Sequence, residues 1–359
     1  MLYRSPCLLA VSLLWSFLSV SAQNIQKGDY GYLYCHMSDL GEYTAYALSR
    51  DGLHWHDLAG GRAVMPTETV SPIEGGSRDA YVCRRSDGSE GFLMAVTDMC
   101  VRKSKVWNNH GIDLLTSDDL IHWHSTAFDF RTGDSIFCDP GSPSLYADWS
   151  KVCRVWAPQI CWDPNYVWPD GQTGGYFIYY SIWSTYPNDT HDRMVYSYAD
   201  RSFTRLTKPR VWFDWGYATI DADINYLASD GMFHLLIKKE GGHPGIFQTK
   251  APALAGPWPE PDEADFVSFE GQKKCEGPSA FQLAGEDGWR VGYIQYSDRP
   301  KHYRICRADA YLTGFRDPQD IEGVTAPQHG SFMRLTEEEY HRLEDYFGTE
   351  QPAPGQTTH

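Results

Sequence analysis

Short apolar runs recur along the chain and predict β-strands. The clearest lie at residues 32–34, 91–96, 176–180, 232–237 and 289–294; all are rich in aromatic or β-branched residues and bounded by glycine or polar turns. Helical periodicity occurs only near the end, at residues 336–346, where Thr336 precedes three glutamates as a helix N-cap would. The pattern predicts an all-β chain with one late helix.

A short sequence motif also recurs along the chain, each time after a group of strand-like runs. Residues 49–55 (SRDGLHW) resemble residues 117–123 (SDDLIHW), and weaker echoes follow at 199–203, 256–258 and 312–315. Five copies at blade-like intervals predict a five-bladed β-propeller. A β-sandwich is the alternative, because a long series of short strands serves both architectures.

One blade is expected to be divided between the two ends of the domain. Strand-like residues 32–55 precede the first complete unit, and a lone strand-like segment at 329–333 follows the last one. Pairing the N-terminal strands with this C-terminal strand would close the ring and leave few exposed sheet edges. The four complete units begin near Asp79, Trp156, Asp221 and Glu276.

The ends of the chain are set apart from this domain. A basic residue, an apolar stretch and a small-residue end predict a signal peptide at residues 1–22, cut before Gln23. The protein is therefore expected to be secreted or periplasmic, and no later stretch is long enough to span a membrane. Residues 23–350 are expected to form the propeller, and residues 351–359 a flexible tail.

The charge balance narrows the range of partners. A net charge of −16 argues against nucleic acid or an anionic membrane and suits a neutral oligo- or polysaccharide. An aromatic content of 14% fits a carbohydrate site as well as a large core. The chain is expected to act as a monomer.

Eight cysteines follow the signal segment, and an exported protein can oxidise them. The three in loop-like segments are expected to be bridged, although the sequence does not assign the pairs; they are Cys138, Cys153 and Cys161. The strand-borne cysteines are expected to be buried thiols; they are Cys83, Cys275 and Cys306. No spacing indicates a zinc site.

Three acidic clusters stand directly before strand-like runs. They are residues 77–80 (SRDA), 220–223 (IDAD) and 275–278 (CEGP). Equivalent positions of a closed ring converge at its centre, so the three clusters are expected to share one pocket. Alone, an aspartate before a strand would be read as a turn cap. Together, carboxyl groups that repel one another at a cost in stability favour a chemical role.

These motifs resemble those of the glycoside hydrolases of family 43, over nearly the whole chain after the signal segment. In that family three blades each supply an acidic residue, and the intervening blade bears a Trp-Ala-Pro element. Here residues 78–79 match the motif of the general base, 155–158 (VWAP) the intervening element, 220–221 the third acid and 276–278 the general acid. Residues 328–330 (QHG) resemble the segment that places a histidine on the propeller axis.

The resemblance implies an inverting hydrolase in which two carboxyl groups act on opposite sides of the glycosidic bond. Asp79 would be the general base that activates water, and Glu276 the general acid. Asp221 would be the pKa modulator, raising the proton affinity of Glu276 and orienting it. Asp223 lies two residues on and is expected on the same face of the strand, so it would contact substrate or exchange roles with Asp221.

Other residues are candidates for sugar or axial contacts. Trp156 would be a stacking wall or part of the core. Arg299 and Arg304 would bind sugar hydroxyls or pair with Asp221, unless they lie on a solvated strand edge. His329 would contact an axial water or a structural ion such as calcium, or be an ordinary interior histidine. No cofactor is required for the chemistry.

The resemblance implies a secreted inverting exo-glycosidase that removes terminal sugars, foremost α-L-arabinofuranose, from plant-type polysaccharides. A β-D-xylosidase and an exo-β-1,3-galactanase of the same fold remain open. So does a carbohydrate-binding propeller without catalysis. A retaining sucrose- or fructan-cleaving enzyme would share the Arg-Asp motif, but the nucleophile segment of that class is missing from this sequence.

Overall fold

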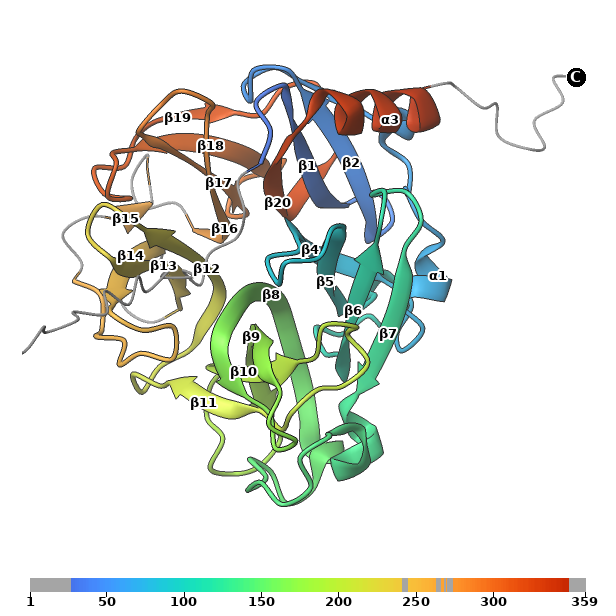
Figure 1. The fold of residues 1–359 in the computed structure, drawn as a ribbon, viewed down its shortest axis with the longest axis vertical. Coiled ribbons are helices and arrows are strands. Elements are labelled where there is room, and N and C mark those ends of the chain that lie inside the picture. The colour runs from blue at the N-terminus through green and yellow to red at the C-terminus, as the bar shows by residue number, and fades with distance from the viewer. Residues whose placement is uncertain (1–26, 241–244, 263–265, 268, 270–273, 349–359) are drawn as a thin grey trace, which may run out of the picture.

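Five four-stranded antiparallel sheets surround a central axis in the computed structural model (Figure 1). The structure describes residues 27–240, 245–262, 266–267, 269 and 274–348. The sheets confirm the predicted all-β class and the five-bladed propeller, in place of a sandwich. The predicted signal peptide and the predicted tail lie outside the described residues.

Each blade places one strand next to the axis and three farther out. From the inside outwards, the blades are β4 (Ser77–Arg84), β5 (Phe92–Asp98), β6 (Gly111–Ser117) and β7 (His124–Asp129); β8 (Val152–Val167), β9 (Thr173–Ser184), β10 (Arg193–Ala199) and β11 (Arg210–Phe213); β12 (Thr219–Leu227), β13 (Met232–Lys239), β14 (Gly245–Ala251) and β15 (Phe266–Val267); β16 (Cys275–Gln282), β17 (Trp289–Gln295), β18 (His302–Ala308) and β19 (Arg316–Asp320); and β20 (Pro327–Leu335), β1 (Gly31–Ser38), β2 (Tyr43–Ser49) and β3 (Trp55–Asp57).

The last of these blades joins the two ends of the domain, as predicted. Strand β20 pairs antiparallel with β1, and Leu33 faces Met333 in the register. The Phe332 ring stacks on Tyr34 at 4.5 Å within this blade and on Phe281 of the neighbouring blade at 4.3 Å. The ring is therefore closed by main-chain pairing and by aromatic packing between blades.

The recurring sequence motif forms the same turn in two blades. In the first copy the Gly52 amide donates to Ser49 Oγ at 2.8 Å, and the His54 amide donates to Asp51 Oδ1 at 2.8 Å. In the second copy the corresponding amides donate to Ser117 Oγ at 3.0 Å and to Asp119 Oδ1 at 2.8 Å. Serine and aspartate side chains that bond nearby amides define a turn locally, which explains why the repeat is visible in the sequence.

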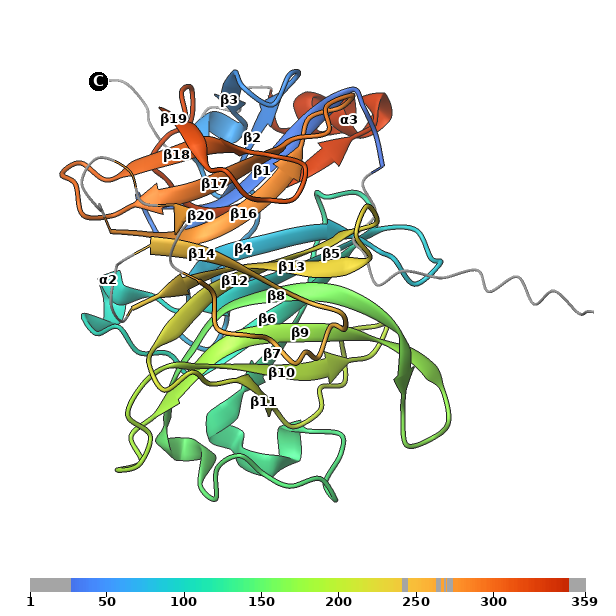
Figure 2. The same ribbon diagram turned by 90° about the vertical axis from the view of Figure 1, so that its left-hand side faces the viewer.

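Helices are short and lie outside the sheets (Figure 1 and Figure 2). The longest is α3 (Glu337–Phe347), where Thr336 and Glu339 form the reciprocal bonds of a capping box, as the Thr336 motif predicts. Glu339 also accepts a hydrogen bond of 2.5 Å from Arg84, which fixes the helix against β4. The other helices are η1 (Ala59–Gly61), α1 (Thr67–Val70), α2 (Val101–Ser104), η2 (Phe130–Ile136) and η3 (Trp149–Lys151).

None of the eight cysteines of the described chain forms a disulfide. The expected bridging of Cys138, Cys153 and Cys161 is therefore wrong for this structure. Cys83, Cys275 and Cys306 are buried thiols, as predicted. In the part of the chain that the structure describes, every helix is too short or too polar to cross a bilayer.

Candidate active site

Four inner strands carry the same irregularity near the axis. Asp79, Ala157, Asp221 and Gly277 have φ values of 55°, 50°, 51° and 67°, and each coincides with a shift in strand register. A bulge of this kind bends the strand and changes where its side chains point. Positive φ is costly for residues that carry a Cβ, and such strain gathers at functional sites.

The residues around these bulges enclose a pocket of about 260 Å³ at one end of the axis. Four carboxyl groups line it, and three of them belong to Asp79, Asp221 and Glu276. The structure therefore brings together the three acidic residues that the sequence predicts to converge. The other lining residues are Met37, Arg78, Met99, Trp107, Trp156, Ile220, Glu240, Ile294, Tyr296, Gln328 and His329.

His329 lies between two of the carboxyl groups. Its Nδ1 is 3.5 Å from Asp79 Oδ1 and 3.8 Å from Asp221 Oδ2. Gly277 allows this approach, because a Cβ at that position would lie 2.7 Å from Cγ of the imidazole ring. The imidazole therefore faces Asp79 on one side and Asp221 on the other.

Burial and neighbouring charges determine the protonation states of His329, Asp79 and Asp221. Burial disfavours the imidazolium form, but Asp221, Asp79 and Glu276 outweigh it and raise the pKa of His329 to about 9. Burial would raise the pKa of Asp79, yet the hydrogen bond and charge of His329 lower it overall. Burial, reinforced by Glu276 and Asp79, raises the pKa of Asp221 to about 7 despite the charge of His329. At neutral pH Asp79 is thus a carboxylate beside an imidazolium.

Lys238 is a buried cation beside Glu276. Its Nζ lies 2.5 Å from Glu240 Oε1, 3.3 Å from Glu276 Oε2 and 3.0 Å from the Tyr296 hydroxyl. Burial opposes the charge, but Glu276 and Glu240 more than compensate and raise the pKa of Lys238. The side chain of Glu276 is 32% exposed, against 13% for Asp79, so Glu276 is the more accessible of the two from solvent.

Two indole rings form walls of the pocket. Trp156 lies under the Arg154 guanidinium at 4.6 Å, and Trp107 lies 5.2 Å from that of Arg78. Arg78 is itself paired with the buried Glu42. Trp107 is 53% exposed, so its ring stands at the mouth of the pocket, where a sugar could pack on it.

The remaining candidates lie outside this pocket. Asp223 lines a different cavity, because the bulge at Asp221 breaks the alternation that would place both side chains on one face. Arg299 donates to main-chain oxygens of its own loop, at 2.7 Å to Tyr296 and 2.8 Å to Asp298. Arg304 pairs with Asp320 at 3.0 Å. The positions of these three residues therefore do not support the predicted contacts with a sugar in the pocket of Asp79, Asp221 and Glu276.

Sequence reasoning missed Lys238, Glu240 and Tyr296. One signal was available: Lys238 and Lys239 end the apolar run of β13, and a lysine inside a sheet needs an acidic partner. As for an axial ion, no group of three or more His, Cys, Asp or Glu residues suited to a metal occurs within the described residues.

Comparison with known proteins decides the family. The model of the "Probable glycosyl hydrolase domain" family, related to glycosyl hydrolase family 43, matches residues 28–341. This chain belongs to that family. The predicted resemblance is confirmed, and with it the class of glycoside hydrolase.

The relatives agree with this assignment. An α-L-arabinofuranosidase of Bifidobacterium longum is 24% identical over 289 residues, which cover 70% of this chain and 25% of that protein. This chain thus spans about a quarter of that relative's length. A putative exo-β-1,3-galactanase of Bifidobacterium bifidum matches 84% of this chain and 92% of its own at a TM-score of 0.51 and 11% identity. A further structure, described as a glycoside hydrolase, matches 86% of this chain and 63% of its own at a TM-score of 0.50 and 12% identity. The two structures show the shared fold.

Proposed function

We propose that the chain is a secreted, inverting exo-glycosidase that removes terminal α-L-arabinofuranose from plant-type polysaccharides. The observation that carries this proposal is the convergence of Asp79, Asp221 and Glu276 on one pocket. The choice of sugar is supported by the name of the Bifidobacterium longum relative. A volume of about 260 Å³, small for a ligand site, favours a single terminal sugar over a chain bound along its length.

In the proposed reaction a water molecule attacks the anomeric carbon while Asp79 takes its proton. Glu276 donates a proton to the glycosidic oxygen as the bond from the anomeric carbon to that oxygen breaks. The products are the free sugar with inverted configuration and a polysaccharide with a new hydroxyl group. His329 keeps Asp79 ionised before the step, because its charge stabilises the carboxylate.

Asp221 orients the acid without reacting. Its Oδ2 accepts a hydrogen bond of 3.1 Å from the amide of Gly277, the residue after Glu276. This bond fixes the bulge that carries the general acid. In the proposal Asp221 also tunes the proton affinity of the site, and its own pKa of about 7 means that its charge changes near neutrality.

The Lys238 ammonium lies between the general acid of the proposal, Glu276, and a second carboxylate, Glu240. The Lys238 ammonium is closer to Glu240, at 2.5 Å, than to Glu276, at 3.3 Å. Much of its charge is therefore balanced by Glu240.

A panel of substrates tests the proposal. Wild-type protein is assayed on nitrophenyl α-L-arabinofuranoside, β-D-xyloside and β-D-galactoside and on β-1,3-galactan oligomers. Asp79→Asn is the inactive control throughout, and Glu276→Gln is a second one on the oligomers, whose leaving oxygen needs a proton. Turnover of the arabinoside above the others is expected, and NMR of the first product should show inversion. A retained anomer would exclude the inverting mechanism. Binding without turnover on any substrate would favour the non-catalytic propeller.

Export and oligomeric state are parts of the same proposal. The apolar N-terminal segment supports cleavage before Gln23. N-terminal sequencing of the protein recovered from the medium or periplasm should begin at Gln23, and light scattering should give the mass of one chain. A chain that keeps residues 1–22, or a dimer, would contradict these points.

A further inference from the structure

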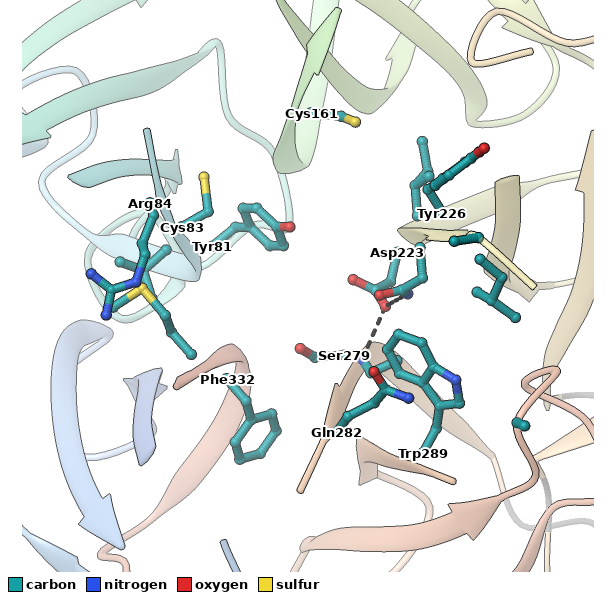
Figure 3. A pocket seen from close by; sticks show the side chains of 18 of the residues that line it. Tyr81, Cys83, Arg84, Cys161, Asp223, Tyr226, Ser279, Gln282, Trp289 and Phe332 are labelled. Atoms are coloured by element: carbon teal, nitrogen blue, oxygen red, sulfur yellow. Dashed lines mark hydrogen bonds between the residues drawn. The ribbon is translucent and has the colours of Figure 1, made fainter. Parts of the chain in front are cut away.

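A second cavity, of about 460 Å³, lies at the opposite end of the propeller axis from the catalytic pocket. Figure 3 shows side chains that line it. The inner strands that carry the catalytic carboxyl groups also line it, but with residues farther along each strand. No described residue lines both cavities. We propose that this second cavity is a binding site for a neutral mono- or disaccharide, separate from the catalytic pocket and independent of which sugar that pocket hydrolyses.

A buried carboxylate forms the polar floor of the cavity. Asp223 is 3% exposed, and its Oδ2 accepts hydrogen bonds from the Ala280 amide at 2.9 Å and from Asn225 Nδ2 at 2.8 Å. Both of these hydrogen bonds go to Oδ2. In Figure 3 the Asp223 carboxyl and the Tyr81 phenol point toward one another across the hollow. A buried carboxylate oxygen needs hydrogen-bond donors, which sugar hydroxyls supply.

Aromatic rings surround this floor. Phe332, Trp289 and Tyr226 line the cavity together with Tyr81, and they come from different strands (Figure 3). Such rings offer apolar faces for the C–H groups of a sugar, and they leave hydroxyl groups to the polar side chains. A volume of about 460 Å³ lies within the range of small-molecule sites and can hold one or two sugar rings.

The charges of the lining residues exclude other classes of ligand. Arg84 is the one basic residue among the lining side chains, and Glu339 already pairs with it at 2.5 Å. An anion would therefore meet Asp223 and Asp287 without a free cation, and an apolar ligand would bury Asp223 without donors. Hydroxyl and amide groups are instead spread around the wall, on Ser229, Ser279, Asn225 and Gln282. That distribution suits a ligand with many hydroxyl groups better than a compact cation.

The cavity has an accessible rim. Ala228, Ser229 and Asp287 line it and are exposed, whereas Asp223 and Ser279 are buried. A ligand can therefore enter from the surface opposite the catalytic pocket. A bulky side chain at the rim should block entry without touching the inner strands near Glu276.

Binding to the full-length Glu276→Gln protein tests the proposal, with L-arabinose, D-xylose, D-galactose and xylobiose as probes. Calorimetry should show saturable binding of at least one probe that Ala228→Trp weakens at least tenfold. The matched control is Ala253→Trp, which adds the same side chain at an exposed position outside the cavity and should leave binding unchanged. A crystal soaked with the tightest probe should show it beside Asp223.

Several results would overturn the proposal. One is that none of the sugars binds, or that Ala228→Trp leaves the affinity of every sugar that does bind unchanged. Another is saturable binding of tetramethylammonium or Ca²⁺ at Asp223 with no saccharide bound. The readout is binding and not turnover, so an error in the proposed hydrolytic activity would leave this result intact. In the wild-type background Ala228→Trp should keep the full rate of hydrolysis.

Discussion

The two ends of the propeller axis are built on the same inner strands and carry different charges. At one end Asp221 shares a pocket with three other carboxyl groups and the imidazolium of His329. At the other end Asp223, two residues along β12, is held by a backbone amide and an asparagine among aromatic rings. Burial raises the pKa of both, to about 7 and about 6. Similar burial thus occurs in different surroundings, because the His329 imidazole lies beside only one of the two carboxyl groups.

The largest expected effect separates the two ends completely. Glu276→Gln should lower kcat on an oligosaccharide by roughly 1,000-fold, because an amide cannot protonate the leaving oxygen. Asp287→Asn, at the rim of the second cavity, should leave kcat unchanged, and steady-state kinetics compare the two. Equal losses would show that the ends are not functionally distinct.

A pair of substitutions on one strand sharpens the comparison. Asp221→Asn should lower kcat about 100-fold, because it changes the charge beside the acid and the base. Asp223→Asn should keep kcat within about threefold of the wild-type value, a change of less than 1 kcal/mol, because asparagine can still accept the hydrogen bond from the Ala280 amide. Each variant is measured for kcat and KM separately. A larger loss from Asp223→Asn would mean that the second cavity controls β16 and thereby the acid.

The charge of His329 should appear in the pH dependence. Activity should fall about tenfold per unit as pH rises above about 9, where the imidazolium is lost, and His329→Gln should lack that step. The pKa of His329 is raised on folding, so its contribution to stability is complete below about pH 6.5 and is lost as pH rises through about 9. Thermal unfolding from pH 6 to 10 in both proteins measures this difference. A variant with an unchanged alkaline step would contradict the assignment.

The smallest effect concerns the stability of the catalytic end. Lys238→Met should lower the free energy of unfolding by about 1–2 kcal/mol, below the usual cost of breaking a buried ion pair, because Glu240 and Glu276 keep access to water. Lys239→Met is the matched control, since its neighbour Glu260 lies farther off, at 3.7 Å, and is 54% exposed. Urea unfolding compares the two. Equal losses would show that the Lys238 pair adds nothing beyond a buried lysine.

The sequence predicts the fold well because local bonds define its repeat. The serine and aspartate of the turn motif bond amides within a few residues, so the same letters recur in the blades that form it. The closure of the ring could also be predicted from the sequence, because the strand-like segment at 329–333 had no neighbouring segment in the sequence with which to pair. The convergence of Asp79, Asp221 and Glu276 follows from the same repeat.

The parts of the site that sequence reasoning missed depend on backbone geometry and on distant partners. Strict alternation would put Asp223 beside Asp221, but a residue at φ 51° reverses that expectation. Lys238 gains its role from Glu276, which lies in the next blade. Arg299 donates its hydrogen bonds to carbonyl groups of its own loop, and such main-chain contacts cannot be predicted from a pattern of side chains.

The pairing of β20 with β1 determines when the domain can finish folding during synthesis. A nascent chain emerges with β1–β3 first, and the innermost strand of that blade, Pro327–Leu335, leaves the ribosome last. Until then Leu33 and Cys35, both fully buried in the finished ring, have no sheet on one side. The propeller can therefore complete its folding only after β20 has left the ribosome, and until then the ring stays open.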